Sequence, residues 1–317
     1  MRALPVRFSL AASVAVVALG GILSAGSPPQ ATEKTIYVSI LDKNDRPVKG
    51  AGKDNFLVRE DNLDVEVVKV EQAPKTPVAV VLLADTTTSF VPFSRDLRVA
   101  SESFARAFLE KNPGSQVAIW EFGGADIPVV PFTNDVTKLA EGSKKLFPKG
   151  SISQAQADAI AAGAATARGQ NVIASNLLEA IIGASKELAK REEPRRVIVS
   201  MNADVSVEAS RVQGNKVQEE VIKANVQWFG LSLQAQVANG PLRDNVMNGL
   251  IPYSGGVRHT IVSIQALESE LINMADIIAN QYAVTYKRTA GEPKGVVVGL
   301  RGGPPDIKVA ATRWASK

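Results

Sequence analysis

Hydrophobic positions fall into a recurring pattern over most of the chain. From residue 78 onward, short apolar runs alternate with longer amphipathic stretches. Runs of this kind are typical of an α/β fold, in which a doubly wound, mostly parallel sheet is buried on both faces by flanking helices. The predicted strands are 78–84, 115–122, 127–132, 195–201, 226–233 and 282–288, and the predicted helices lie around 95–111, 135–146, 176–191, 214–224, 241–250 and 264–281.

The two ends of this α/β region carry a different pattern. Residues 27–73 predict a small β unit, because apolar and polar residues alternate in short runs separated by turn-rich segments. The prolines of "APKTP" mark its end, so the α/β domain is expected to span 77–290. Residues 291–317 predict a C-terminal β extension. The ends of a domain are often close together, and these two β segments are therefore expected to pack against each other.

Residues 1–26 have the layout of a secretory signal peptide. Two arginines precede an apolar run, 8–23, which ends in small residues, so cleavage is predicted near Gly26 or, as a second choice, Ala31. An uncleaved anchor is the alternative, because about 18 apolar residues can just span a membrane. The small residues favour cleavage. The mature chain is then expected to be exported, to the periplasm or beyond the cell, without a membrane span.

Composition narrows the classes of function. The chain has no cysteine, which excludes disulfides, thiolate metal sites and cysteine nucleophiles. Its formal charge of +4 includes Arg2 and Arg7, and falls to +2 once they leave with the signal peptide. No basic stripe with interleaved aromatic residues is present, so nucleic acid is not an expected partner.

A carboxylate and several hydroxyls follow the most apolar predicted strand, in "VAVVLLADTTTSF". Ligands of open α/β sheets bind at the carboxyl ends of the strands, which is where Asp85 is expected to lie. Asp85, Thr87 and Ser89 can together present hard oxygen ligands, which suit Mg²⁺, Ca²⁺ or Mn²⁺ rather than zinc. The alternative is that Thr87 and Ser89 cap the next helix.

The motif "DTTTS" resembles the D-x-S/T-x-S motif of the metal-ion-dependent adhesion site in von Willebrand factor type A (vWA) domains. Other segments resemble exported bacterial proteins related to these domains, in the same order: the β preamble "VSILDKNDRPVKGAGKDNFLVREDN", then "VVPFTND", "SNLLEAI", "ANVQWFGLSL" and "ESELINMADIIANQYAVTYK". The resemblance covers roughly residues 35–315. It implies a vWA fold and a protein-binding or adhesion function.

The resemblance also implies a set of site residues. The metal ligands would be Asp85, Thr87 and Ser89 from the first loop and Ser175 from the second, where the family usually has threonine. The third loop departs from the pattern, because "MNADVS" has Ala203 at the expected acid position and Asp204 at the expected glycine. Either Asp204 shifts to serve the ion, or the site lacks its second carboxylate.

In the family, an open coordination position on the ion accepts an acidic side chain of a protein partner. The resemblance thus implies a cation-dependent adhesion module that binds Mg²⁺, Ca²⁺ or Mn²⁺. The alternative is a structural or assembly scaffold of the same fold whose binding needs no cation. The Ala-, Gln- and Gly-rich insert, 151–170, predicts a surface helix near the metal face. It is expected either to shape partner choice or to be only a surface elaboration.

An enzyme is not expected. The only histidine is His259, and the chain has no G-x-S-x-G elbow, phosphate-binding loop, dinucleotide fingerprint or H-E-x-x-H motif. His259 is therefore interpreted as a structural histidine at the surface or at a strand end, and no catalytic residues are predicted.

Overall fold

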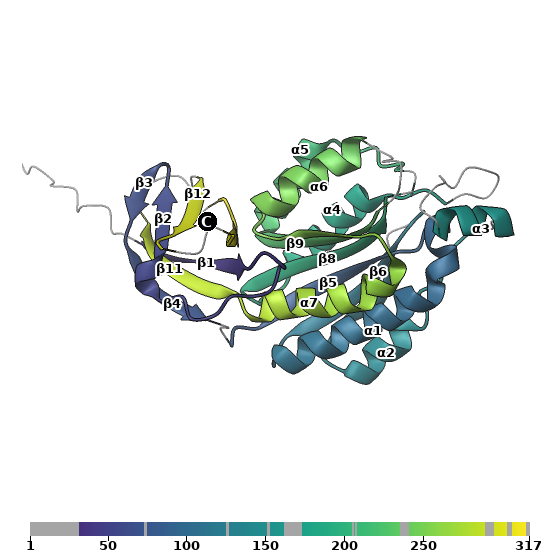
Figure 1. Ribbon diagram of the computed structural model, residues 1–317, viewed down its shortest axis with the longest axis horizontal. Coiled ribbons are helices and arrows are strands. Elements are labelled where there is room, and N and C mark those ends of the chain that lie inside the picture. Colours follow the sequence, from purple (N-terminus) through teal and green to yellow (C-terminus); the bar gives the residue numbers. More distant parts are fainter. Residues whose placement is uncertain are drawn as a thin grey trace, which may run out of the picture. The chain divides into compact units, whose positions relative to one another are not determined.

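The computed structural model describes residues 32–72, 75–124, 127–150, 153–161, 173–204, 206, 208–234, 241–288, 295–302 and 306–314. Within them, a six-stranded sheet has the order β10-β9-β8-β5-β6-β7 (Figure 1). Five of its strands are parallel, and the edge strand β7 runs antiparallel to β6. The strands are β5 (Val78–Asp85), β6 (Gln116–Phe122), β7 (Ile127–Thr133), β8 (Arg195–Ala203), β9 (Val226–Leu233) and β10 (Arg258–Ile261).

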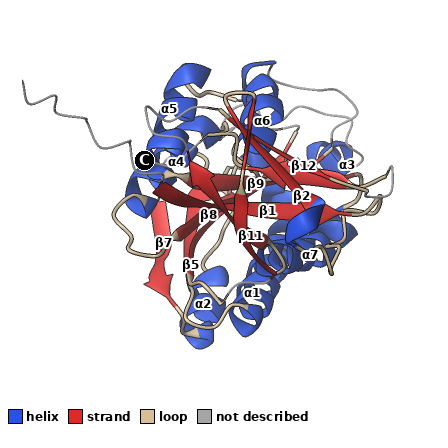
Figure 2. Ribbon diagram, turned by 90° about the vertical axis from the view of Figure 1, so that its left-hand side faces the viewer, coloured by secondary structure: helices blue, strands red, loops and turns tan. Residues whose placement is uncertain are grey.

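Helices cover both faces of this sheet, as Figures 1 and 2 show. Helices α1 (Ser94–Lys111), α2 (Val136–Ser143) and α7 (Leu267–Ala279) lie on one face, and α4 (Leu177–Leu188), α5 (Gly214–Ala224) and α6 (Pro241–Tyr253) on the other. Strand β5 shows why: Val80 and Leu82 contact the first helical layer, and Val81 and Leu83 the second. A strand with apolar side chains on both faces is stable only where both faces are covered, so β5 lies in the centre of the sheet.

Two antiparallel sheets form the remaining β region. One has the order β13-β1-β11-β4 and the other β12-β2-β3. Their apolar faces share one core, which includes Val38, Phe56, Tyr282 and Val296. The strands are β1 (Thr32–Leu41), β2 (Phe56–Glu60), β3 (Leu63–Val65), β4 (Val67–Gln72), β11 (Tyr282–Arg288), β12 (Val296–Leu300) and β13 (Lys308–Ala311). The short helices are η1 (Lys53–Asn55), η2 (Thr88–Phe93), α3 (Gln154–Ala161) and η3 (Ile264–Ala266).

The predicted fold class is confirmed, and so is the packing of the N- and C-terminal β segments, because β1 pairs with β13 and β2 with β12. One predicted strand lies in another sheet. Residues 282–288 form β11, which pairs with β1 and β4 rather than joining the parallel sheet. Within the predicted β unit, residues 63–72 form two strands in different sheets, β3 and β4. The edge strand β10 was not predicted.

Two predictions concern residues that the structure describes only in part or not at all. The signal peptide, 1–26, lies outside the described residues. Of the insert 151–170, only 153–161 are described, and they include α3, whose Ile160 is buried. Among the described residues, no helix is both long enough and apolar enough to cross a membrane.

Candidate functional site

Asp85 is the last residue of β5 and lies at the carboxyl edge of the parallel sheet. Strand β8 runs parallel beside β5, so the loop that follows Ala203 emerges next to Asp85. The first and third loops of the predicted site are therefore neighbours. Asp85, Thr87, Ser89 and Ser175 are all buried, with at most 1% of each residue exposed.

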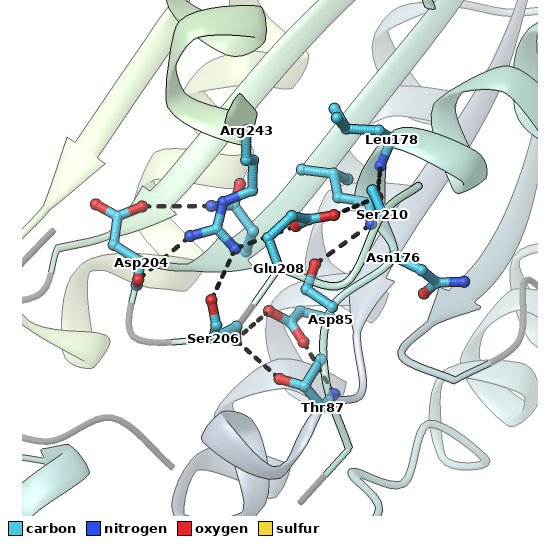
Figure 3. Close-up of polar contacts among 12 residues, drawn as sticks. Asp85, Thr87, Asn176, Leu178, Asp204, Ser206, Glu208, Ser210 and Arg243 are labelled. Atoms are coloured by element: carbon cyan, nitrogen blue, oxygen red, sulfur yellow. Dashed lines mark hydrogen bonds and ion pairs between the residues drawn. The ribbon is translucent and has the colours of Figure 1, made fainter. Parts of the chain in front are cut away.

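Both carboxylate oxygens of Asp85 accept hydrogen bonds from the protein (Figure 3). The Thr87 backbone N–H donates to Oδ1 at 2.9 Å. The Ala203 backbone N–H and the Ser206 hydroxyl each donate to Oδ2 at 3.1 Å. Buried carboxylates are tolerated when donors surround them in this way. Asp85 thus fastens the first loop to the third.

The hydroxyls of Thr87 and Ser206 complete this arrangement. Their oxygens lie 2.9 Å apart. The Ser206 hydroxyl donates to Asp85, and the Thr87 side chain is hydrogen-bonded to Asp85 as well. Ser206 therefore contacts both Asp85 and Thr87, two of the residues that the sequence predicted as metal ligands.

Arg243, near the start of α6, supplies a positive charge to the same edge. It is fully buried, and its guanidinium donates to the carbonyls of Ser206 and Asp204, each at 3.2 Å. Its Nη1 also lies 3.5 Å from Oε2 of Glu208. One arginine thus holds the backbone of the third loop and pairs with a carboxylate on it.

Glu208 joins the second loop to this network. Ser210 donates to its carboxylate, and the hydroxyl of Ser175 is bonded to it as well. The backbones of Ser175 and Glu208 form an isolated β-bridge. Ser175 Oγ also accepts the N–H of Leu177, at 3.3 Å, at the start of α4. Ser175 therefore links Glu208 to the start of α4.

The other two predicted ligands are placed differently. Oδ1 of Asp204 lies 3.5 Å from both Asn202 Nδ2 and Arg258 Nη2, and Figure 3 shows its carboxylate turned away from that of Asp85. Ser89 lies in η2, and its buried hydroxyl has no hydrogen-bond partner among the described residues. The structure thus brings Asp85 and Thr87 together, but it does not bring the carboxylate of Asp204 to them.

Burial raises the pKa of all three carboxyl groups near Arg243. For Asp85, burial raises the pKa, and the hydrogen bonds from Thr87 and Ala203 and the charge of Arg243 oppose the rise. For Asp204, burial raises the pKa against the charges of Arg258 and Arg243. For Glu208, burial raises it against hydrogen bonds from Ser210 and Ser175 and the charge of Arg243. Desolvation therefore exceeds the attraction to the arginines at each site.

These side chains offer a divalent cation only part of the ligand set that it favours. Mg²⁺ favours near-octahedral oxygen ligands that include one or two carboxylates. Here Asp85 is the one carboxylate at the first loop, its two oxygens already accept protein hydrogen bonds, and the arginine of the network is itself a cation. Among the described residues, no group of three or more histidine and acidic side chains could hold a metal ion. Only one observation favours a bound ion: the buried hydroxyl of Ser89 has no hydrogen-bond partner among the described residues, so it could coordinate one.

The sequence prediction missed Ser206, Glu208 and Arg243. A signal for two of them was present, because "DVSVE" places Asp204, Ser206 and Glu208 at alternate positions after a strand. Nothing local identified Arg243, since it lies 37 residues from Ser206 along the chain and resembles any arginine in the first turn of a helix.

Comparisons with known proteins concern the fold. No protein-family model matches the sequence, and no curated protein matches it. Similar solved structures include von Willebrand factor type A from Catenulispora acidiphila, at 8% identity and a TM-score of 0.48, covering 89% of this chain and 74% of that one. Another is the VWA domain of SpRpn10, at 13% identity and a TM-score of 0.45, covering 64% of this chain and 96% of that one.

A third similar structure is proximal thread matrix protein 1 from the mussel byssus, at 12% identity and a TM-score of 0.47. The alignment covers 66% of this chain and 50% of the mussel protein, so the chain spans about half of that protein's length. At such identities the similarity is one of fold alone. The strand order of the sheet and the motifs of the sequence are together those of a vWA-like fold.

The raised pKa of Glu208 predicts a pH-dependent effect of Glu208→Gln. Because its folded pKa exceeds its unfolded pKa, Glu208 binds protons more readily in the folded state. Its contribution to stability is therefore most favourable below the unfolded pKa and declines as pH rises through the folded pKa. The free energy of unfolding of the wild type, relative to Glu208→Gln, should therefore fall as the pH rises above the ordinary glutamate pKa of 4.5, by about 1.4 kcal/mol per unit of pKa difference.

Urea unfolding of both proteins at several pH values measures this difference. Glu187→Gln is a matched control, because Glu187 pairs with Lys190 on the surface of α4. The prediction is contradicted if the wild type gains stability over Glu208→Gln as the pH rises.

Proposed function

We propose that this protein is an exported, vWA-type protein-binding module whose partner binding does not depend on a divalent cation. The fold supports the module, and the N-terminal signal-like segment supports export. The carboxyl edge of the sheet is the expected binding face, since ligands of open α/β sheets bind there.

One observation supports the proposal that partner binding does not depend on a divalent cation. The carboxylate of Asp85 is held by donors from three residues, Thr87, Ala203 and Ser206. In the family pattern, the third loop supplies a carboxylate near this point. Here the same loop supplies the N–H of Ala203 and the hydroxyl of Ser206, and Arg243 supplies the positive charge. The loops are thereby joined by hydrogen bonds and an ion pair. This favours a module, or an assembly scaffold, that presents a preformed edge to its partner.

A catalytic role is not part of the proposal. His259 lies in β10 and is only 8% exposed. Its Nδ1 is 3.2 Å from Glu270 on α7, and its Nε2 is 3.7 Å from Asp45, which also pairs with Lys308. These contacts join β10, α7 and the turn after β1. The arrangement supports a structural role for the histidine.

Titration with Mg²⁺, Ca²⁺ and Mn²⁺ tests the proposal. Binding to the folded state alone raises stability by mass action, by about 2.7 kcal/mol when the ion is at 100 times its Kd. We expect the melting temperature of the wild type to change by less than about 1 °C at millimolar concentrations of each ion. Capture of a partner from the exported fraction is expected to be equal with and without a chelator.

Asp85→Asn is the control, because it removes the carboxylate that a cation would need. A saturable stabilisation of the wild type by any of the three ions, absent in Asp85→Asn, would refute cation independence. Loss of partner capture on chelation would do the same.

A further inference from the structure

Arg195 is a buried arginine and the first residue of β8. It therefore lies at the amino-terminal edge of the parallel sheet, whereas Asp85 lies at the carboxyl edge. The residue is 2% exposed. Its Nη2 donates to the carbonyl of Ile278 at 2.6 Å and to Oε1 of Gln281 at 2.8 Å. Its Nε and Nη1 are buried and have no hydrogen-bond partner among the described residues. Three N–H groups of this guanidinium, one on Nε and two on Nη1, are therefore without an acceptor among the described residues.

The charge of Arg195 is also uncompensated within the described part of the chain. Its two acceptors there are neutral, and no ion pair of the described residues includes it. The ring of Tyr37 on β1 lies 4.8 Å from its guanidinium carbon, which offsets part of the desolvation. Burial nevertheless lowers the pKa of Arg195 to about 10. A buried charge without a counter-ion is costly.

A small cavity adjoins Arg195. Its lining combines the polar residues Thr35, Asn225 and Gln227 with apolar ones such as Ile36 and Trp314, and among the described residues it includes no aspartate or glutamate. Arg196, the next residue of β8, also borders the cavity, and its guanidinium donates to the carbonyls of Ala224 and Arg191. The cavity therefore combines positive charge with unused hydrogen-bond donors.

The size of the cavity limits what it can hold. Its volume is about 20 Å³, on the scale in which one water molecule needs about 10–15 Å³. A monatomic anion fits this space, whereas a phosphate or an organic carboxylate needs more room. A water molecule would satisfy a donor but would leave the charge uncompensated. We propose that this cavity binds a small inorganic anion of about the size of chloride, held by Arg195.

Thermal unfolding in sodium chloride and in sodium gluconate at equal ionic strength tests this proposal. Gluconate is too large for the cavity, so the comparison separates binding from screening. We expect chloride to raise the melting temperature of the wild type by about 2–4 °C, saturably. Arg195→Met is expected to lose the difference. Arg95→Met is the matched control, because Arg95 is exposed on α1, and it should keep the difference.

A second measurement covers the case in which Arg195→Met does not fold. Wild-type crystals grown in sodium bromide should show anomalous scattering from bromide next to Nε and Nη1 of Arg195. Equal melting temperatures in chloride and gluconate, or a cavity that holds only water in bromide crystals, would overturn the proposal. Bromide in the crystals without a chloride effect in solution would mean binding at crystal concentration only, and would overturn it as well.

Discussion

Asp85→Ala is expected to lower the free energy of unfolding by about 3–5 kcal/mol. The substitution leaves three donors, from Thr87, Ala203 and Ser206, without their acceptor in a fully buried site. It also removes a negative charge that interacts with Arg243. Urea unfolding at neutral pH measures the effect.

Two further variants serve as comparisons for Asp85→Ala. Asp85→Asn keeps the shape and one acceptor oxygen, so it is expected to lose less than Asp85→Ala. Asp96→Ala removes an acid from the first turn of α1, away from the network, and should cost about 0.5 kcal/mol. If Asp85→Ala stays within about 1 kcal/mol of the wild type, Asp85 does not join the loops in the way its contacts indicate.

Arg243→Met is expected to destabilise the protein by a similar amount, about 3–5 kcal/mol, and to lower the melting temperature markedly. The carbonyls of Ser206 and Asp204 lose their buried donor, and Glu208 loses its cationic partner. Thermal and urea unfolding both measure the loss. Arg106→Met is the control. Arg106 pairs with Glu102 on the surface of α1, and its loss should cost no more than about 0.5 kcal/mol.

A double-mutant cycle distinguishes the ion pair from simple loss of packing. If Arg243 and Glu208 interact as their 3.5 Å separation indicates, Arg243→Met combined with Glu208→Gln should cost less than the sum of the single changes. Additive losses would mean that Arg243 acts through the loop carbonyls alone.

Much of the fold could be predicted because its signals are local. The run from Val78 to Ala84 is apolar on both faces, which only a central, doubly covered strand satisfies. Residues 282–288 were wrongly assigned to the parallel sheet from their apolar residues alone. Their buried and exposed positions alternate, as in a sheet with one solvated face, and this alternation was a usable sign that they belonged with β1 and β4. Strand β10 is short and polar, so its sequence carried little signal.

The candidate site was predictable only in part. The sequence identified Asp85 and Thr87, and it showed that the third loop lacks the usual acid at Ala203. It could not show that Ser206 would contact both Asp85 and Thr87, because the bond between Ser206 and Asp85 joins residues 121 positions apart. The direction of the Asp204 carboxylate was equally undetermined, since it depends on Arg258 in a strand that had not been predicted.

The sequence by itself determined most strands of the central sheet and its helices, the β segments at the two ends and the position of Asp85 at the carboxyl edge. These follow from periodicity and burial along single segments of chain. The tertiary structure decided which charges and hydrogen-bond donors surround Asp85 at the carboxyl edge. It placed a buried arginine from α6 against the third loop and turned Asp204 away, and at the opposite edge it gave Arg195 no counter-ion among the described residues. Charges and hydrogen bonds act through space, and their partners are therefore fixed only when distant segments meet.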